Sequence, residues 1–239
     1  MQTNPYTAPA ALITGGRVTT TINSITVDFD TIHYAICTGP LHGGLHHVMA
    51  VRNQQLAFFV ETEKELPGGS AANYLAAEFE QVDLPVNFCS GLLTSASMEK
   101  HAYAKVEQGS VIVEVIATAG FEATAHRAGD GYLYEEADGS FHSPGTINLL
   151  IFTNKALTDG AMVRALITVT EAKAAALADA GKTSVVSHNI ATGTATDGVI
   201  LTIDTGGEIL TDAGTFSLFG DTLAKAVRLA LARCVENLK

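Results

Sequence analysis

The strongest structural signal in this 239-residue sequence is the apolar, β-branched run at residues 111–118. Valine and isoleucine favour extended strands because their branched side chains pack well on a pleated surface. A chain that repeats such runs has to pair them in a sheet, and the sheet then governs the rest of the fold. Comparable strand signals recur at residues 17–29, 32–38, 46–53, 101–106, 145–153 and 199–203.

Three segments instead show helical periodicity, at residues 71–81, 158–181 and 221–237. Ser70 and Thr158 are suitable N-caps, and Gly181 is a suitable terminator of the second helix. In the second helix we expect an inward apolar stripe of Val163, Leu166, Ile167, Thr170, Ala174 and Leu177. In the last helix we expect Leu223, Val227, Ala230, Leu231 and Cys234 to face inward.

The order of these segments predicts the fold class. Helices do not alternate regularly with strands, which disfavours a doubly wound parallel sheet. No internal repeat or linker divides the chain. We therefore predict one α+β domain over residues 1–239, with a mixed, largely antiparallel sheet packed against helices. Residues 121–144 are polar and glycine-rich, and we expect a long loop on the surface or beside a site.

Composition restricts the classes of partner. The formal charge of −11 and the absence of tryptophan argue against nucleic-acid binding. No run approaches the roughly 18 apolar residues of a membrane span, and the N-terminus lacks the pattern of a secretory signal. Cys37, Cys89 and Cys234 have no metal-ligand spacing, so we expect ordinary buried thiols in a cytoplasmic protein. A monomer and a homo-oligomer are both compatible with the sequence.

The stretch from Thr192 to Asp197 is the first candidate for a site. It alternates threonines with small residues and ends in a carboxylate before an apolar strand. Small residues let a ligand approach the backbone, and hydroxyls can donate or accept hydrogen bonds. Such a segment suits the lining of a pocket, although a threonine-rich turn that enters a strand would look the same. A phosphate cradle is disfavoured because no P-loop lysine and no helix follow.

Glu171 is the second candidate, on the edge of the predicted apolar stripe of the second helix. A carboxylate there either pairs with a basic group or, when desolvated, gains affinity for protons, which suits a general acid or base. The alternative is a salt-bridged boundary residue. Asp197 has two similar interpretations: it caps a turn, or it takes part in the reaction. The same helical wheel predicts that Lys173 points away.

Two other chemistries are disfavoured. His42, His46 and His47 lie near a turn, but residues 46 and 47 face opposite sides of a strand, so at most one can join His42. We therefore expect no metal site. Thr146 would be an activated nucleophile if the chain cleaved itself after Gly145, but the chain is one continuous polypeptide.

The chain resembles the adenosylcobinamide amidohydrolase family from about residue 35 to its C-terminus. The motifs occur in the family's order, and the ordered set is more specific than any single member. They are Gly43-Gly44 with Arg52-Asn53, Gly91-Leu92-Leu93-Thr94, Thr118-Ala119-Gly120, Gly145-Thr146-Ile147-Asn148, Asp159-Gly160-Ala161-Met162, Thr170-Glu171-Ala172-Lys173 and Ala191-Thr192-Gly193-Thr194-Ala195-Thr196-Asp197.

The resemblance implies hydrolysis of the amide that joins the corrinoid ring of adenosylcobinamide to its aminopropanol arm. The product would be adenosylcobyric acid, which re-enters cobalamin synthesis by salvage. Cobalt belongs to this substrate, so we expect no cofactor and no protein-bound metal. Glu171 is the candidate general base, and Asp197 is the second candidate catalytic residue. The candidate substrate-binding residues are Gly43, Gly44, Asn53, Thr146, Asn148, Thr192, Gly193, Thr194 and Thr196.

The sequence departs from the family pattern in three places. Ala195 stands where glycine is more common, Leu45-His46-His47 replaces a segment that commonly bears arginine, and residues 121–130 differ. These changes leave two alternatives open: a protein that binds a corrinoid without hydrolysing it, and an amidohydrolase for another amide.

Overall fold

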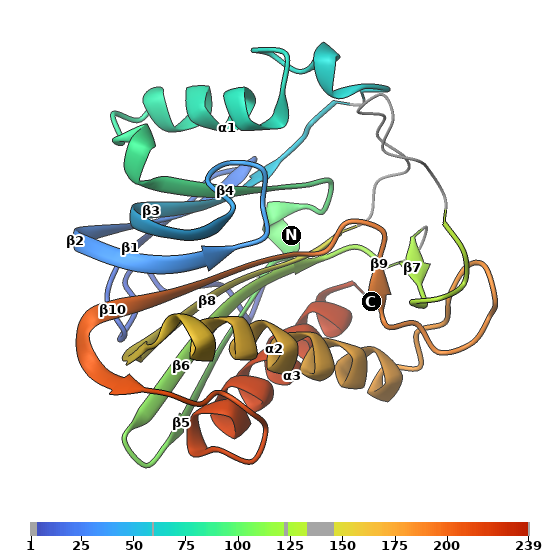
Figure 1. Cartoon of the computed structure of the whole chain (residues 1–239). Helices are drawn as coiled ribbons and strands as arrows, with labels where there is room; N and C mark the ends of the chain where they lie inside the picture. The colour runs from blue at the N-terminus through green and yellow to red at the C-terminus, as the bar shows by residue number, and fades with distance from the viewer. Residues whose placement is uncertain (1–3, 59, 122–123, 133–145, 239) are drawn as a thin grey trace.

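The structure is a computed structural model that describes residues 4–58, 60–121, 124–132 and 146–238. One large open sheet carries three helices, in the α+β arrangement that the sequence predicts (Figure 1). The strands of the sheet are β1 (Arg17–Thr20), β2 (Ser24–Cys37), β3 (Gly44–Gln55), β4 (Cys89–Thr94), β5 (Ala102–Gln108), β6 (Val111–Ala119), β8 (Ile147–Leu157) and β10 (Gly198–Leu210). The helices are α1 (Ala71–Glu80), α2 (Asp159–Asp179) and α3 (Leu218–Asn237).

The strand order is β4-β3-β2-β10-β8-β6-β5, and β1 pairs with β2. Two neighbouring pairs, β10–β8 and β3–β4, are parallel, and the other pairs are antiparallel. The prediction of a mixed, largely antiparallel sheet is therefore confirmed. The two strand signals at residues 17–29 and 32–38 contribute to one long strand, β2, whose register against β3 shifts between Asp28 and His33.

The helix caps follow the sequence closely. Ser70 accepts a hydrogen bond from the backbone N–H of Asn73 at 3.1 Å, and Thr158 accepts one from Ala161 at 3.3 Å. Helix α3 begins three residues earlier than predicted because Ser217 caps it. Its five predicted inward residues are all fully buried.

The predicted inward stripe of α2 is largely wrong. Val163 and Ile167 are 52% and 44% exposed, whereas Leu177 is buried as expected. The face that packs inward is rich in alanine, and such small side chains let one helix approach another closely. The fully buried residues of α2 include Ala161, Met162, Ala165, Thr168, Val169 and Ala172.

The sheet curls so that its edge strand β4 returns to the centre. The backbone oxygen of Leu93 in β4 accepts a hydrogen bond from Asn148 in β8 at 2.9 Å. A Cβ atom added to Gly198, at the start of β10, would lie 2.9 Å from Leu92. This closure encloses a core cluster on the concave face that includes Val51, Leu150 and Ile200.

A short arm extends from the sheet end at which β8 and β10 begin (Figure 1). It consists of the antiparallel pair β7 (Ala125–His126) and β9 (Gly193–Thr194). The predicted loop at residues 121–144 falls largely outside the described residues. Within its described part, Phe121 and Ala125 belong to the core rather than to the surface.

None of the helices within the described ranges is long and apolar enough to cross a membrane.

Candidate active site

Sheet pairing brings several of the motifs to one end of the sheet. Gly198 of β10 pairs with Asn148 of β8, and Asn148 pairs with Thr118 of β6. Gly44 pairs with Cys37 near the same end, where β2 meets the first residues of β10. The neighbouring strand ends thus collect residues that are far apart in the sequence.

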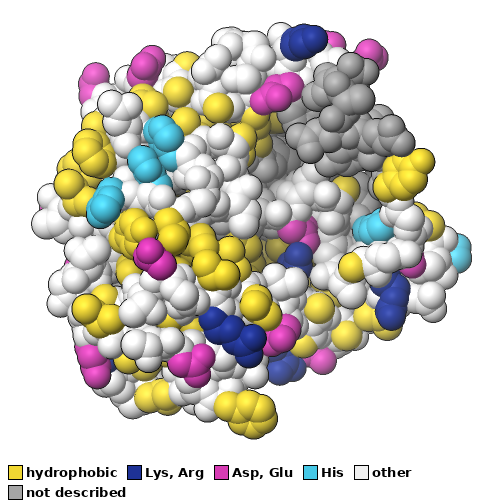
Figure 2. Space-filling view, viewed as in Figure 1, with side chains coloured by type: hydrophobic (Ala, Val, Ile, Leu, Met, Phe, Trp, Pro, Cys, Tyr) yellow, Lys and Arg dark blue, Asp and Glu magenta, His cyan; other side chains and the backbone are white. Residues whose placement is uncertain are grey.

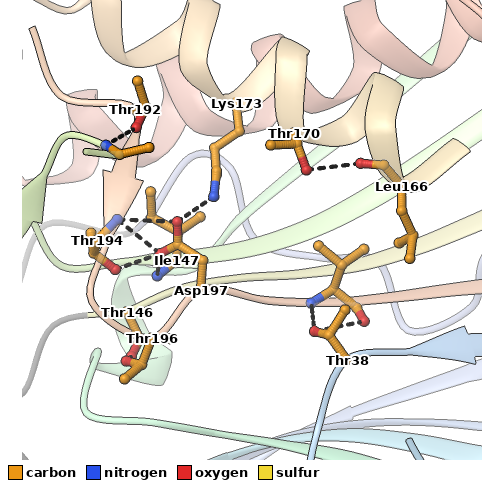
Figure 3. Close-up of polar contacts among 12 residues, drawn as sticks. Thr38, Thr146, Ile147, Leu166, Thr170, Lys173, Thr192, Thr194, Thr196 and Asp197 are labelled. Carbon is orange, nitrogen blue, oxygen red and sulfur yellow. Dashed lines mark hydrogen bonds and ion pairs between the residues drawn. The ribbon is translucent and has the colours of Figure 1, made fainter. Parts of the chain in front are cut away.

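Asp197 is the centre of this region (Figure 3). Its Oδ1 atom accepts hydrogen bonds from the backbone N–H of Ile147 at 3.1 Å and from the hydroxyl of Thr194. The backbone N–H of Thr194 lies 3.1 Å from Oδ2. The Oδ2 atom also accepts from the ammonium of Lys173. Since a carboxylate offers about four acceptor positions, this one is fully engaged by the protein.

Lys173 is the site residue that the sequence argument missed. The prediction that it points away is wrong: its side chain descends from α2 to Asp197 (Figure 3). The side chains of Lys173 and Asp197 are 13% and 11% exposed, so the ion pair is largely sheltered from water. The available signal was the Thr170-Glu171-Ala172-Lys173 motif, which contains both Glu171 and this basic residue.

Gly193 makes room for the ion pair. A Cβ atom at this position would lie 2.4 Å from the Oδ2 atom of Asp197 and 3.0 Å from the Nζ atom of Lys173. Real Cβ atoms do not tolerate a contact of 2.4 Å, so the pair depends on the absence of a side chain here. This gives a steric reason for the glycine in the Thr192–Asp197 stretch.

The other threonines of the region are divided between the site and the arm. The hydroxyls of Thr146 and Thr196 lie 2.5 Å apart, so two predicted site residues meet beside Asp197 (Figure 3). The hydroxyl of Thr192 accepts a hydrogen bond from the backbone N–H of Ala128 at 2.9 Å and so stabilises the β7–β9 arm. Gly145, the other half of the self-cleavage hypothesis, lies outside the described residues.

Asn53 and Asn148 form a buried network. Asn148 donates to the Oδ1 atom of Asn53 at 2.8 Å, and Asn53 donates to the hydroxyl of Thr118 at 2.8 Å. The three residues are at most 2% exposed. Both amides therefore hold strands together from inside, and their predicted contact with substrate stays a prediction.

Gly43 and Gly44 are exposed at the start of β3. Gly44 has a φ of +85°, and a Cβ atom on Gly43 would lie 2.7 Å from the backbone oxygen of Gly39. Gly44 thus has a positive φ, and Gly43 lies close to neighbouring backbone. These two conditions explain the glycines without a ligand, so the binding role of this pair also stays a prediction.

Glu171 lies apart from these contacts. Its side chain is exposed, and no hydrogen bond or ion pair of the described chain involves it. Two residues along a helix correspond to a rotation of about 200°, so Glu171 leaves α2 on nearly the opposite side from Lys173. The structure groups Asp197 with Lys173 and not with Glu171.

The histidines meet as the strand argument predicts. The rings of His42 and His46 stack with centroids 4.5 Å apart, whereas His47 packs against Tyr34 instead. His42 and His46 also bond to the backbone oxygens of Cys89 and Asn87. Across the described ranges, no group of three or more His, Cys, Asp or Glu side chains is arranged to hold a metal ion.

The surface is hollowed between the layer that carries α1 and the β7–β9 arm (Figure 2). An acidic and a basic side chain meet within the hollow, next to a surface with many apolar side chains.

The chain is similar to known proteins. An uncharacterized protein of Methanocaldococcus jannaschii is 36% identical over 150 residues, which cover 57% of this chain and 58% of that protein. A protein of Pyrococcus horikoshii with a known crystal structure aligns over 98% of this chain and 81% of its own, with 12% identity and a TM-score of 0.43. The model of the family described as adenosylcobinamide amidohydrolase matches residues 9–239. The chain therefore belongs to the adenosylcobinamide amidohydrolase family.

Proposed function

We propose that this protein hydrolyses the amide between the corrinoid ring and the aminopropanol arm of adenosylcobinamide and thereby yields adenosylcobyric acid. The observation that carries this proposal is the meeting of three family motifs at one carboxylate. Ile147, Lys173 and Thr194 each come from a different motif or element, and all three bond to Asp197. Family membership alone would not require these segments to share a contact.

The chemistry needs three things from the protein. A water molecule or another nucleophile must add to the carbonyl carbon, donors must stabilise the negative oxygen, and the leaving amine must gain a proton. We propose that the donors are backbone N–H groups and threonine hydroxyls between Thr192 and Thr196, other than those of Thr194, which bond to Asp197. Glu171, whose side chain is exposed, is the base predicted from the sequence.

Asp197 is better suited to orientation than to proton transfer. Every hydrogen bond described above occupies one of its acceptor positions, so a water molecule would have to displace a protein donor to reach it. We propose that Asp197 is a positioning residue that fixes Lys173 and the turn before β10. This role keeps the carboxylate essential without making it the base.

A corrinoid is a large ring fringed with amides, and ligands of this kind need apolar area together with a few polar partners. The hollow in Figure 2 provides apolar side chains beside a polar end. We propose that the ring lies along the apolar part and that the aminopropanol amide reaches the polar end. No cofactor is part of the proposal, and the cobalt ion is part of the substrate.

The direct test is incubation of the purified protein with adenosylcobinamide, followed by mass spectrometry. The expected products are adenosylcobyric acid and free aminopropanol, formed in equal amounts. Retention of intact adenosylcobinamide on the protein would instead support the corrinoid-binding alternative. Absence of both binding and turnover, with hydrolysis of a different amide, would support the second alternative.

A further inference from the structure

The ammonium group of Lys173 has hydrogen-bonding capacity that the fold does not use. An ammonium carries three N–H donors. Within the described chain, Asp197 is the single acceptor that the Lys173 Nζ atom contacts. Two donors therefore have no acceptor among the described residues.

The side chain of Lys173 is largely sheltered but keeps some contact with solvent, with 13% of its surface exposed. A lysine commonly buries its aliphatic stem while the charged end stays in contact with water. Here the stem extends from α2, and the charged end points to Asp197 (Figure 3).

The position of the charge is fixed in advance. The carboxylate of Asp197 holds the ammonium, and the backbone N–H groups of Ile147 and Thr194 hold the carboxylate. Gly193 lets the pair lie directly against the backbone. A positive charge that is already oriented stabilises a developing negative charge without further rearrangement, which is the basis of oxyanion stabilisation.

Resting on the amide hydrolysis proposed above, we propose that Lys173 is a catalytic residue that donates a hydrogen bond to the carbonyl oxygen of the substrate amide. As water oxygen bonds to the carbonyl carbon, the π electrons move to the carbonyl oxygen, and the ammonium faces the resulting charge. When the carbonyl re-forms, the C–N bond breaks and the amine leaves with a proton that originates from the attacking water. Lys173 keeps its own protons throughout.

The first variant is K173M, which keeps the length and apolar stem but removes the charge. Loss of one oxyanion donor typically lowers kcat by about 10²- to 10³-fold. We expect a loss of this size in kcat with little change in KM, since the interaction strengthens in the transition state. K173R retains a positive charge and should keep more activity than K173M.

A second variant, K173C, allows the positive charge to be restored chemically in a protein that has already folded. K173C should be as slow as K173M, and alkylation with 2-bromoethylamine should restore an ammonium at nearly the lysine length and recover at least about tenfold in rate. Alkylation with iodoacetamide, which adds a neutral group, should recover nothing. The native thiols interfere little, because burial raises the pKa of Cys37 to about 11 and the pKa values of Cys89 and Cys234 to about 12. The parent protein, treated with both reagents, is the control.

The double variant K173M/D197N tests a purely structural role. If Lys173 only neutralised Asp197, removal of both charges would restore activity, and that result would overturn the inference. We expect the double variant to stay slow. If the parent protein forms no product, the proposed function is overturned, and so is the catalytic role of Lys173. An active parent, with K173M within about threefold of its kcat, overturns only the role of Lys173.

Discussion

The Nζ atom of Lys173 contacts the Oδ2 atom of Asp197, and this ion pair joins helix α2 to the turn before strand β10. The two residues come from separate motifs, and neither motif by itself indicates that its charged residue has this partner. Because Asp197 also accepts from the backbone of Ile147, the pair fixes the starts of two neighbouring strands. An arrangement of this kind can serve stability, catalysis or both.

Replacing Asp197 with asparagine should lower both the stability of the protein and its turnover. D197N removes the charged acceptor, and hydrogen bonds to charged groups contribute about 1.5–3 kcal/mol, so the free energy of unfolding should fall by an amount in that range. Turnover should fall by roughly 10²-fold because Lys173 is no longer held. Urea unfolding and product formation measure the two effects. D204N changes an exposed aspartate within β10 and should match the parent.

Gly193→Ala should disturb the ion pair by steric contact alone. Its backbone does not have positive φ, so the added Cβ meets Asp197 without creating backbone strain. We expect a loss of about 1–3 kcal/mol in the free energy of unfolding, as is typical of overpacking, together with slower turnover. The matched control is G160A in α2, where a Cβ meets nothing within 4 Å. There alanine should stabilise by roughly 0.5–1 kcal/mol. Equal behaviour of the two variants would contradict this account of Gly193.

Glu171→Gln tests the base predicted from the sequence. A general base predicts a fall in kcat of about 10²-fold or more with corrinoid binding retained. The exposed position of Glu171, opposite Lys173 on the helix, favours a smaller effect than that of K173M. Steady-state rates of the two variants, compared at saturating adenosylcobinamide, decide between these outcomes. A deficit in E171Q as large as that in K173M would establish both residues in the reaction.

Stability should decrease in mild acid because of His101. This side chain is 2% exposed, its Nε2 atom accepts from the backbone N–H of Ala8 at 2.9 Å, and its Nδ1 atom bonds to the oxygen of Met98. Burial lowers the pKa of His101 below its ordinary value of 6.5. The unfolded chain therefore binds a proton more readily than the folded protein as the pH falls below about 6.5. The contribution of His101 is present above that pH and is lost as the pH falls toward the folded value.

The measurement is the free energy of unfolding in urea between pH 8 and pH 5. H101Q should be less stable at pH 8 and should show a flatter dependence on pH than the parent. H188N, at an exposed histidine with a φ of 60° that asparagine tolerates, should leave the slope unchanged. If the parent and H101Q have the same slope, His101 does not cause the acid sensitivity.

Hydrolysis should not depend on a protein-bound metal ion. The described ranges provide no suitable group of three ligands, and the proposed donors are backbone N–H groups, hydroxyls and an ammonium. Dialysis against EDTA, followed by an assay in metal-free buffer, should leave the rate unchanged. Loss of activity that added zinc or magnesium restores would show that a ligand set had been overlooked.

The elements themselves were largely predictable from the sequence. The run that forms β6, the caps Ser70 and Thr158, and the inward face of α3 all follow from local propensity and periodicity. The buried face of α2 could not be predicted in this way, because periodicity favoured burial of its large aliphatic residues. In the structure Val163 and Ile167 face solvent, and small residues such as Ala165 are buried. Which face is buried depends on how closely the partner helix approaches, and a single helix does not encode that distance.

By itself, the sequence determined the fold class, the family through the order of its motifs, and the threonine-rich stretch that ends in Asp197. Only the tertiary structure decided which charged group of the Thr170-Glu171-Ala172-Lys173 motif meets that carboxylate. Glu171 and Lys173 are two residues apart and leave the helix in nearly opposite directions. The rotation of α2 about its axis, set by its packing against α3 and the sheet, turned Lys173 inward and Glu171 outward. That rotation depends on several packed elements together, so it could not be predicted from the sequence of α2.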